Sequence, residues 1–437
     1  MSATIAPARF AAEFRAICGA EYVNDAPTAN ILGAVPTIAV TPGSPDEIAE
    51  ILRFANEHGL SVVPAGGLTQ QHTGNRPPQV DVLLYTSRLT EVDHYDPGDL
   101  TIGVGAGWTV AHVSARVAAD QLFFAGDPAL PERATVGGML ATGLYGPHRH
   151  GYGGLRDYCI GVRFVTGDGR KAKGGGRVVK NVAGYDMMKL LIGSWGTLGI
   201  ITSASFKLFP APRQTRTFVT EFASAAEAFA FRYRVIHSPL DPICLELMSP
   251  EAGGLLATGA TWSILLRAAG SDAVLARYRA ELGAAVSREV EGPAEHDLWQ
   301  SMSDFSHSME ERYPRSLLLS MTLPPVDVQP VLDGLATVAH SNGLTPAVIG
   351  RVGIGHLLVA MWPEPQSEVA QAGFVNAASG VRDRLPRDVS MAVLHCPEEA
   401  CGQIGAWAVT PTDLESIRAA KHALDPNEVL NRGRFLF

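Results

Sequence analysis

Charged residues are scarce in this chain, and they form no basic block. They make up 18% of 437 residues, with 35 Lys and Arg against 44 Asp and Glu, which gives a net charge of −9. Proteins that bind nucleic acid or anionic membranes through their electrostatic field carry clustered Lys and Arg side chains. The composition therefore argues against nucleic acid and an anionic lipid surface as partners.

Cysteine is scarce as well. The chain has five cysteines, scattered and without a Cys-x-x-Cys spacing: Cys18, Cys159, Cys244, Cys396 and Cys401. Disulfide-rich scaffolds, structural zinc sites and iron–sulfur clusters need paired or closely spaced cysteines. We expect none of these sites and no metal, and a reducing compartment fits the cysteine usage best.

Long apolar runs are missing too. The longest weakly charged run, residues 190–206, is interrupted by glycines and is too short to cross a membrane. Arg9, Glu13 and Arg15 stand where a signal peptide needs an unbroken apolar segment. We expect no transmembrane segment and a cytoplasmic protein, peripheral to the inner membrane only through partners.

The length favours two domains, because 437 residues exceed the chain length that a single hydrophobic core usually supports. In the glycine-dense first half, Ser44-Pro45-Asp46-Glu47 is a capping box that opens a helix. Strands are expected there at 38–40, 61–64, 80–85, 89–95, 100–104 and 158–166. Gly167-Asp168-Gly169 after the last of these strands predicts a hairpin.

The second half has a different pattern. Strands are expected at 261–267, 315–322, 354–361 and 390–395. Helices interleave with these strands, which indicates an antiparallel sheet covered on one face. Near the end, Thr412-Asp413-Leu414-Glu415 is another capping box, and Asp425-Pro426-Asn427 stops the helix that it opens. The predicted fold class is α+β with two domains.

Three glycine-rich segments carry the chemistry of the first half. Residues 64–75, PAGGLTQQHTGN, follow a strand, and adjacent glycines let successive N–H groups converge on an anion such as a pyrophosphate. Residues 135–143 again place two glycines among small side chains. Residues 178–210 combine much glycine with little charge, which suits a wall against a planar cofactor, and a helix is expected over 183–192. An ordinary glycine turn explains any one of these segments alone.

Two nucleotide-binding motifs are excluded. Residues 103–107, GVGAG, match the dinucleotide fingerprint poorly, because the third glycine comes too early and no acidic residue stands suitably downstream. The chain has no GxxxxGK[ST] segment either. We expect neither a Rossmann NAD domain nor nucleotide hydrolysis.

Taken together, the glycine segments resemble a known family, the vanillyl-alcohol-oxidase or PCMH-type FAD-binding flavoproteins. The matching segments occur in the family's order and roughly its spacing: 64–71, 99–113, 134–162, 178–202 and 425–435. The segment VVKNVAGYD, followed by GTLGIIT, is most similar to the FAD-binding E-type subunit of bacterial glycolate oxidase. The resemblance implies a PCMH-type FAD-binding domain, a substrate or cap domain and a C-terminal segment that returns to the FAD domain: 30–212, 213–400 and 401–437.

The resemblance also implies FAD contacts at matching positions. The pyrophosphate would be wrapped by Pro64, Ala65, Gly66, Gly67, Leu68, Thr69 and Gln70. The phosphates and ribitol would be supported by Ala134, Thr135, Val136, Gly137 and Gly138. Gly143 and Gly146 would pass close to the cofactor, and the backbone of Ile200 would hydrogen-bond it. Many relatives link the flavin covalently through a histidine after the GG pair, where this chain has Leu68, so FAD is expected to be non-covalent, with His72 as a fallback linker.

Residues 351–358, RVGIGHLL, stand where metal-dependent D-2-hydroxy-acid dehydrogenases of the superfamily have a histidine- and asparagine-containing metal motif. Arg351 and Leu358 replace two ligands, so no catalytic metal is expected. The arginine fork matches a carboxylate and a histidine is a natural proton acceptor. Arg351 is therefore the candidate carboxylate anchor and His356 the candidate base. The alternative, a surface arginine and a core imidazole, stays open.

The resemblance favours an FAD-dependent oxidoreductase acting on CH–OH donors. It would oxidise a small glycolate- or lactate-like 2-hydroxy acid to the 2-oxo acid by hydride transfer to flavin N5, in a glycolate oxidase-like complex with flavoprotein and iron–sulfur partner subunits. Two alternatives remain: a stand-alone FAD oxidase or dehydrogenase of a sugar or alcohol, and a non-catalytic FAD electron-relay subunit.

Overall fold

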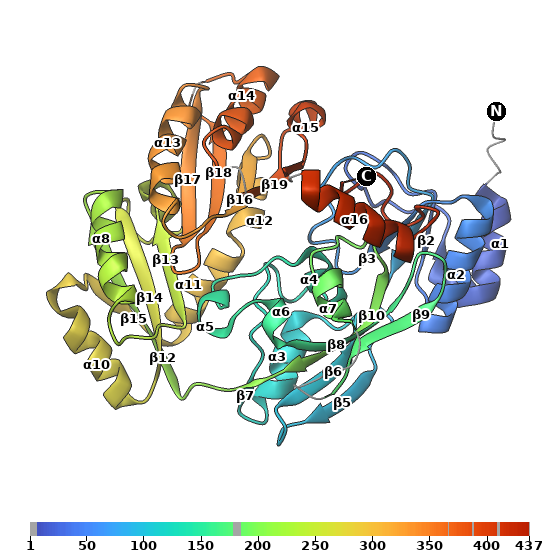
Figure 1. Ribbon diagram of the computed structural model, residues 1–437, viewed down its shortest axis with the longest axis horizontal. Coiled ribbons are helices and arrows are strands. Elements are labelled where there is room, and N and C mark those ends of the chain that lie inside the picture. The colour runs from blue at the N-terminus through green and yellow to red at the C-terminus, as the bar shows by residue number, and fades with distance from the viewer. Residues whose placement is uncertain (1–6, 178–184, 366, 387–388, 409–410, 437) are drawn as a thin grey trace. The chain divides into compact units, whose positions relative to one another are not determined.

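The computed structural model describes residues 7–177, 185–365, 367–386, 389–408 and 411–436. The chain forms two compact units (Figure 1). The first unit comprises Met1–Tyr145, Gly154–Ala211 and Pro411–Phe437, and the second comprises Gly146–Gly153 and Pro212–Thr410. None of the helices in the described ranges is long and apolar enough to cross a bilayer.

The first unit opens with a four-stranded sheet in the order β1-β2-β4-β3. Its elements are α1 (Pro7–Cys18), β1 (Val23–Asn24), β2 (Ile38–Val40), α2 (Pro45–His58), β3 (Val62–Ala65) and β4 (Val82–Tyr85). The predicted capping box starts α2, because Ser44 accepts a hydrogen bond from Glu47 N at 3.2 Å while the Glu47 carboxylate accepts one from Gly43 N at 2.7 Å. β2 and β3 both pair with β4 in parallel, so the loop after β3 leaves from the carboxyl end of this sheet.

An antiparallel five-stranded sheet, in the order β5-β6-β10-β8-β9, completes the first unit. Its strands are β5 (Val92–Asp96), β6 (Thr101–Gly105), β8 (Cys159–Val165), β9 (Lys171–Gly175) and β10 (Ile200–Lys207). The remaining elements of this unit are α3 (Val110–Ala118), β7 (Leu122–Phe123), α4 (Val136–Thr142), α6 (Leu155–Tyr158), α7 (Met187–Leu191), β11 (Phe209–Pro210) and α16 (Pro411–Leu424). The expected hairpin at Gly167-Asp168-Gly169 is confirmed as the β8–β9 connection.

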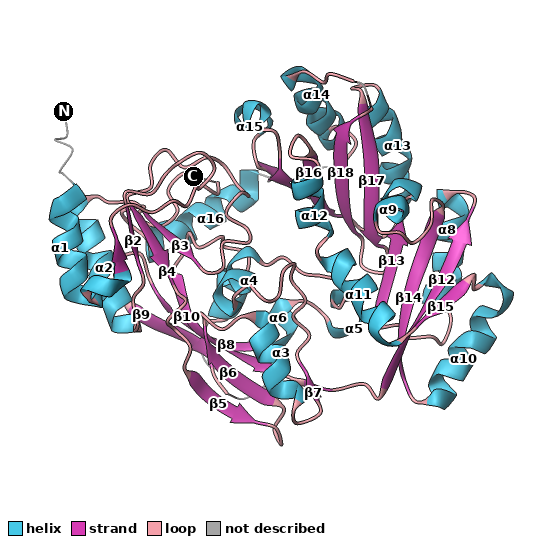
Figure 2. Ribbon diagram, turned by 180° about the vertical axis from the view of Figure 1, so that it is seen from behind, coloured by secondary structure: helices cyan, strands magenta, loops and turns pink. Residues whose placement is uncertain are grey.

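The second unit is built on a nine-stranded antiparallel sheet in the order β15-β12-β14-β13-β17-β18-β16-β19-β20 (Figure 2). Its strands are β12 (Gln214–Phe222), β13 (Cys244–Met248), β14 (Trp262–Gly270), β15 (Arg288–Val290), β16 (Leu317–Thr322), β17 (Leu344–Arg351), β18 (His356–Pro363), β19 (Ser390–His395) and β20 (Trp407–Ala408). Its helices are α5 (Arg149–Tyr152), α8 (Ala225–Ile236), α9 (Pro250–Leu255), α10 (Asp272–Leu282), α11 (Gly292–Ser303), α12 (Phe305–Arg312), α13 (Val328–His340), α14 (Gln371–Arg382) and α15 (Glu398–Ile404).

The two faces of this sheet differ in chemistry, because alternate side chains of a strand point to opposite faces. One face is apolar and packs against side chains from α8, α10, α13 and α14. Its strand residues include Leu245, Leu247, Val348, Leu357, Val359, Leu319 and Met321. The predicted antiparallel sheet is thus confirmed, and the alternating register sends the intervening polar residues of these strands to the other face, called here the polar face.

Two local expectations met a different outcome. The structure joins Cys396 to Cys401 by a disulfide, which the scattered cysteine pattern did not predict. The helix expected over 183–192 is observed as the five-residue helix α7, while residues 178–184 lie outside the described part.

Candidate functional site

The three glycine segments predicted from the sequence meet one another in the first unit. A Cβ on Gly66, in the loop after β3, would lie 2.0 Å from Thr135 Oγ1, which caps α4. A Cβ on Gly196 would lie 2.8 Å from Pro64 Cγ, and one on Gly143 would lie 3.0 Å from Gly193 Cα. Each segment therefore approaches the other two more closely than side chains allow.

The approach of the first two segments is the tightest. A Cβ on Gly67 would lie 1.8 Å from the carbonyl oxygen of Arg133, a backbone atom that has little freedom to move. Gly137 N donates to Ala106 O at 2.9 Å, and its Cβ would meet Ala106 Cβ at 2.9 Å. Glycine at 66, 67 and 137 is thus required by packing.

The loop after β3 has the donors that a pyrophosphate needs. Within the described chain, no residue accepts a hydrogen bond from the backbone N–H of Gly66, Gly67 or Leu68. Leu68 has a φ of 59°, the left-handed conformation that L-residues other than Gly, Asn and Asp rarely adopt. Successive N–H groups in such a turn form an anion-binding concavity. The loop therefore fits the phosphates of FAD.

The other predicted FAD positions lie on α4, on β10 and at Gly146. Thr135 Oγ1 accepts from Gly138 N at 3.2 Å and caps α4, and Gly143 ends that helix with a φ of 67°. Ile200 begins β10 and pairs with Val165. Gly146 lies outside this unit, at the start of the short segment that belongs to the second. Their predicted contacts with FAD stay predictions.

Arg434 anchors the loop after β3 by hydrogen bonds, and the sequence did not indicate this role. Its side chain is 3% exposed and donates to Thr73 O at 3.1 and 3.0 Å, to Gln70 O at 3.0 Å and to the Gln71 side chain. Burial lowers the pKa of Arg434 to about 10, so the guanidinium stays charged at neutral pH. Arg434 belongs to the segment 425–435, which the sequence singled out as one of the matching segments.

A second anchor ties the C-terminal segment to the glycine wall. Lys421 Nζ donates to Asp425 Oδ2 at 2.5 Å, to Thr197 O at 2.9 Å and to Leu430 O at 2.9 Å. Asn431 Nδ2 donates to Trp195 O at 2.7 Å. The last residues of the chain thus fix two of the three glycine segments in place.

In the second unit, Arg351 and His356 lie opposite each other on β17 and β18, on the polar face. Arg351 NH1 donates to His356 Nδ1 at 2.7 Å, and Arg351 Nε lies 3.7 Å from Glu246 Oε1. Since Nδ1 accepts, Nε2 carries the proton and donates to Ser320 Oγ at 3.0 Å. Burial, followed by the charges of Arg351 and Arg149, holds the pKa of His356 well below its usual value. We call Glu246, Arg351 and His356 the Arg351 triad.

A second set of the same composition lies on the same face, and we call it the Arg267 triad. Arg267 Nε lies 3.3 Å from Glu295 Oε1, and Arg267 NH1 is 3.4 Å from His148 Nε2. Glu295 also accepts from Thr217 Oγ1 at 2.7 Å. Burial, followed by the Arg267 charge, lowers the pKa of His148 to about 3. Each triad pairs a buried carboxylate with an arginine that contacts a neutral imidazole.

The segment His148–Gly153 links the two triads. Gly151 N donates to Ile243 O at 3.1 Å, just before β13. The His150 ring packs on Gly353, whose Cβ would lie 2.1 Å from His150 Cε1, in the turn between Arg351 and His356. The sequence alone does not show that His148, Arg149 and His150 lie against this face of the sheet.

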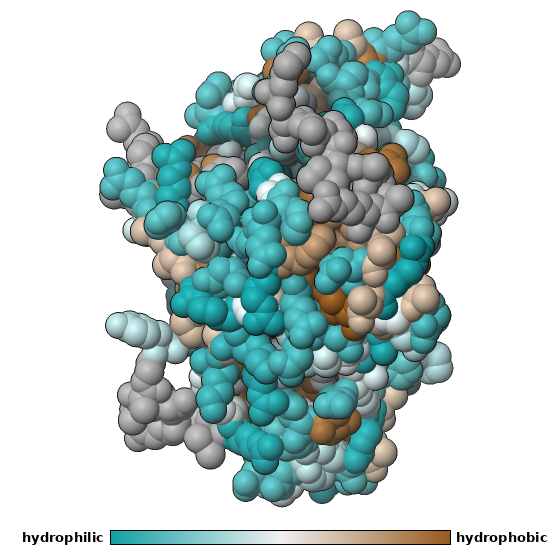
Figure 3. Space-filling view, turned by 90° about the vertical axis from the view of Figure 1, so that its right-hand side faces the viewer, coloured by the Kyte–Doolittle hydropathy of each residue, from teal (hydrophilic) through white to brown (hydrophobic). Residues whose placement is uncertain are grey.

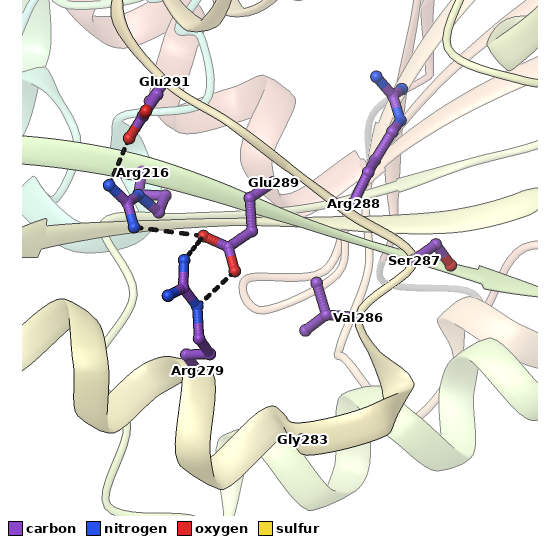
Figure 4. A pocket seen from close by; sticks show the side chains of 8 residues that line it. All are labelled: Arg216, Arg279, Gly283, Val286, Ser287, Arg288, Glu289 and Glu291. Carbon is purple, nitrogen blue, oxygen red and sulfur yellow. Dashed lines mark hydrogen bonds and ion pairs between the residues drawn. The ribbon is translucent and has the colours of Figure 1, made fainter.

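Two open pockets lie away from these residues. One, of about 490 Å³, is lined by residues that include Arg216, Arg279 and Glu289. The Glu289 carboxylate accepts hydrogen bonds from both arginines, and Arg216 also binds Glu291. The Arg288 side chain points away from this group (Figure 4). The other, of about 530 Å³, lies beside β9 and α7. Hydrophobic residues on the face shown in Figure 3 form small separate patches among hydrophilic ones. Across the described ranges, no group of three or more His, Cys, Asp or Glu residues is placed to hold a metal ion.

Comparison with known proteins agrees with the FAD-binding geometry. Residues 36–173 match the family described as FAD binding domain. The chain is 24% identical over 421 residues to glycolate oxidase subunit GlcD of Bacillus subtilis, covering 92% of this chain and 89% of that protein. It is 43% identical over 121 residues to glycolate oxidase subunit GlcE of Escherichia coli, covering 28% of this chain and 35% of that protein.

Two further similarities extend this finding. The chain is 34% identical over 215 residues to D-lactate dehydrogenase of Archaeoglobus fulgidus, covering 49% of this chain and 48% of that protein. A crystal structure of p-cresol methylhydroxylase with substrate bound has the same fold, with a TM-score of 0.72 at 16% identity over 99% of this chain and 97% of that one. Residues 36–173 thus form an FAD binding domain, and the chain is an FAD-dependent oxidoreductase with the PCMH-type fold.

Proposed function

We propose that this chain oxidises a small 2-hydroxy acid, glycolate- or lactate-like, to the corresponding 2-oxo acid. The observation that carries the proposal is the pairwise meeting of the three glycine segments, which forms a bed for FAD in the first unit. Relatives named glycolate oxidase subunits and D-lactate dehydrogenase support the substrate class. In such a reaction the flavin takes a hydride from the α-carbon at N5.

The second unit would supply the polar groups for the substrate. Arg351 and His356 are the proposed carboxylate anchor and proton acceptor. Arg351 donates to the lone pair of His356 Nδ1, so His356 would accept a proton only after that hydrogen bond breaks. The Arg351 triad would therefore have to rearrange when substrate binds, or act by orienting a neighbouring group.

We propose that FAD is bound without a covalent link. Leu68 stands where covalent relatives have a histidine, and the loop offers backbone N–H donors that suit a phosphate. Acid precipitation of the purified yellow protein should release all flavin into the supernatant, measured by absorbance near 450 nm. Flavin retained in the pellet would point instead to a covalent linkage, with His72 as the residue to map.

The names of two relatives, GlcD and GlcE, also support membership of a multi-subunit complex. We propose that the electrons leave through flavoprotein and iron–sulfur partner subunits, because the five cysteines of this chain lack the spacing of a cluster site.

The activity is tested by adding glycolate or D-lactate to the holoprotein under anaerobic conditions. Bleaching of the flavin absorbance supports the proposal. Arg351→Met should slow the bleaching while FAD content stays at the wild-type level, with Arg277→Met on the exposed surface of α10 as the matched control. Wild-type protein that bleaches with sugars or simple alcohols but with no hydroxy acid would favour the stand-alone alcohol oxidase.

The second candidate, an electron relay without substrate chemistry, is favoured by one observation. Both nitrogens of His356 are engaged, and the pKa of this imidazole is held far below neutral pH. A relay subunit needs no base. Bleaching of the flavin absorbance that occurs only after a GlcD-like partner is added would support the relay and contradict the proposed oxidation by this chain.

A further inference from the structure

The hydrogen bonds of the Arg351 triad run in one direction and end at Ser320. Glu246 is fully buried, Arg351 is 4% exposed and His356 is 6% exposed, so the series begins in the interior of the second unit. Arg351 NH1 donates to His356 Nδ1 at 2.7 Å, and a guanidinium has no acceptor atom. His356 Nε2 therefore carries the ring proton and donates it to Ser320 Oγ at 3.0 Å.

Ser320 is the member of this series that a ligand can reach. It is half-buried on β16, whereas the three residues of the triad are buried. Leu319 and Met321 belong to the apolar face of the sheet, so the alternation of the strand places Ser320 on the polar face. In the described part of the chain, the hydrogen bond of the Ser320 side chain is the one that its oxygen accepts from His356. The hydroxyl proton is therefore available to a ligand.

We propose that the Ser320 hydroxyl donates a hydrogen bond to a carboxylate oxygen of the substrate, and that the Arg351 triad positions and polarises this hydroxyl. The proposal rests on the hydroxy-acid function proposed above, and it replaces direct contact between Arg351 and the acid by contact through Ser320. Arg351 and His356 are then positioning residues, and neither has to exchange its partner when substrate binds.

Two physical arguments favour this arrangement over direct binding by Arg351. Arg351 Nε lies 3.7 Å from Glu246 Oε1, and drawing the guanidinium away would leave a buried carboxylate uncompensated, which is strongly unfavourable. Hydrogen bonds that run head to tail polarise one another, so a hydroxyl that accepts from His356 becomes a better donor. The positive end of this series of dipoles lies at the Ser320 proton, where it favours an anionic oxygen.

The sheet fixes Ser320 before a ligand arrives. β16 is paired on both sides, with Ser320 opposite Leu358 on β18 and Ala392 on β19. His356 pairs with Thr322, two residues from Ser320, so the imidazole and the hydroxyl are diagonal neighbours on one face. Because the backbone that carries the hydroxyl is already ordered, little conformational entropy is lost when the ligand binds.

The test measures binding separately from turnover. Oxalate, a dicarboxylate that has no C–H bond from which a hydride can leave, is titrated into the holoprotein by calorimetry. Ser320→Ala should raise the Kd of oxalate by about tenfold, because it removes a hydrogen bond to a charged group. Ser320→Thr keeps the hydroxyl and should change the Kd by less than about threefold.

A double-mutant cycle tests the positioning role of His356. His356→Asn should weaken oxalate binding when Ser320 is present and should weaken it no further in Ser320→Ala, because the imidazole acts through the hydroxyl. Effects of the two substitutions that simply add would show that His356 acts independently of Ser320, and would overturn the positioning role. Flavin content and thermal melting check that each variant folds.

Ser308→Ala is the matched control, since Ser308 is exposed on α12, and it should leave the Kd unchanged. Wild-type affinity in Ser320→Ala overturns the proposal. Equal losses of affinity in Ser320→Ala and Ser320→Thr overturn it too, as does a wild-type protein that binds no oxalate. Oxalate binding that depends on Ser320 in a protein that oxidises no hydroxy acid supports this site and contradicts the proposed function. Oxidation of glycolate together with unchanged oxalate affinity in Ser320→Ala does the reverse.

Discussion

At the scale of the residue, the proposed FAD bed depends on the absence of side chains. Gly67→Ala would place a methyl group 1.8 Å from a backbone carbonyl oxygen, so the loop after β3 or the Arg133 backbone would have to shift. We expect the variant to fold but to lose most of its bound FAD, seen as a lower ratio of absorbance near 450 nm to that at 280 nm.

The control for this experiment is Gly176→Ala, in the same unit, where an added Cβ meets no atom within 4 Å. It should keep its flavin. Full flavin occupancy in Gly67→Ala would show that the two segments are not pressed together as described.

The lowered pKa of His356 leads to a prediction about the pH dependence of flavin reduction. Burial is the largest cause of its lowered pKa, and the charges of Arg351 and Arg149 add to it. Because its pKa is lowered well below 6.5, the His356 imidazole stays neutral between pH 6 and pH 8. The rate of flavin reduction by glycolate should therefore not change over this range through this group. In Arg351→Met one cause is removed, and the pKa should rise toward 6.5 but stay below it. A wild-type rate that falls by half near pH 6.5 would contradict the observed hydrogen bonding.

At the scale of the element, the C-terminal segment works as a clamp on the FAD loop. Arg434→Met removes four hydrogen bonds, to Gln70, Gln71 and Thr73, and leaves their carbonyl groups without this donor. An unmet buried polar group costs about 1–3 kcal/mol. We expect FAD to bind about tenfold more weakly, measured by fluorescence titration of the apoprotein.

Arg432→Met is the comparison, because Arg432 lies two residues earlier, is half-buried and donates to Glu428 O within its own turn. Its FAD affinity should equal that of the wild type. Equal affinity in both variants would mean that the loop holds its shape without the clamp.

Elements with local signals were predictable from the sequence. The Ser44 capping box, the Gly167-Asp168-Gly169 hairpin and the antiparallel sheet of the second unit are confirmed, because each depends on neighbouring residues or a regular alternation. The roles of Arg434 and Glu246 were not predictable. The partners of Arg434 lie hundreds of residues away, and Arg351, the partner of Glu246, lies four strands further along the chain. The Cys396–Cys401 disulfide falls between these cases, since its spacing of five fits no common motif.

At the scale of the whole molecule, the two units should respond to different conditions. FAD binds the folded first unit and stabilises it by mass action. The second unit holds neutral, buried histidines, with the pKa of His148 lowered to about 3. A histidine with a depressed pKa contributes stability that is complete above about pH 6.5, and that stability declines as pH falls toward the folded value, because only the unfolded chain takes up the proton.

Differential scanning calorimetry should therefore resolve two transitions. Excess FAD should raise one and leave the other in place. Lowering the pH from 6.5 to 5 should weaken the other transition by about 1.4 kcal/mol per pH unit through His148. His148→Asn, which keeps a polar group but does not titrate, should flatten that dependence. If instead FAD and pH moved a single transition together, the FAD bed and the two triads would belong to one cooperative structure, and the effects of mutations in one unit on the chemistry of the other would have to be interpreted in that light.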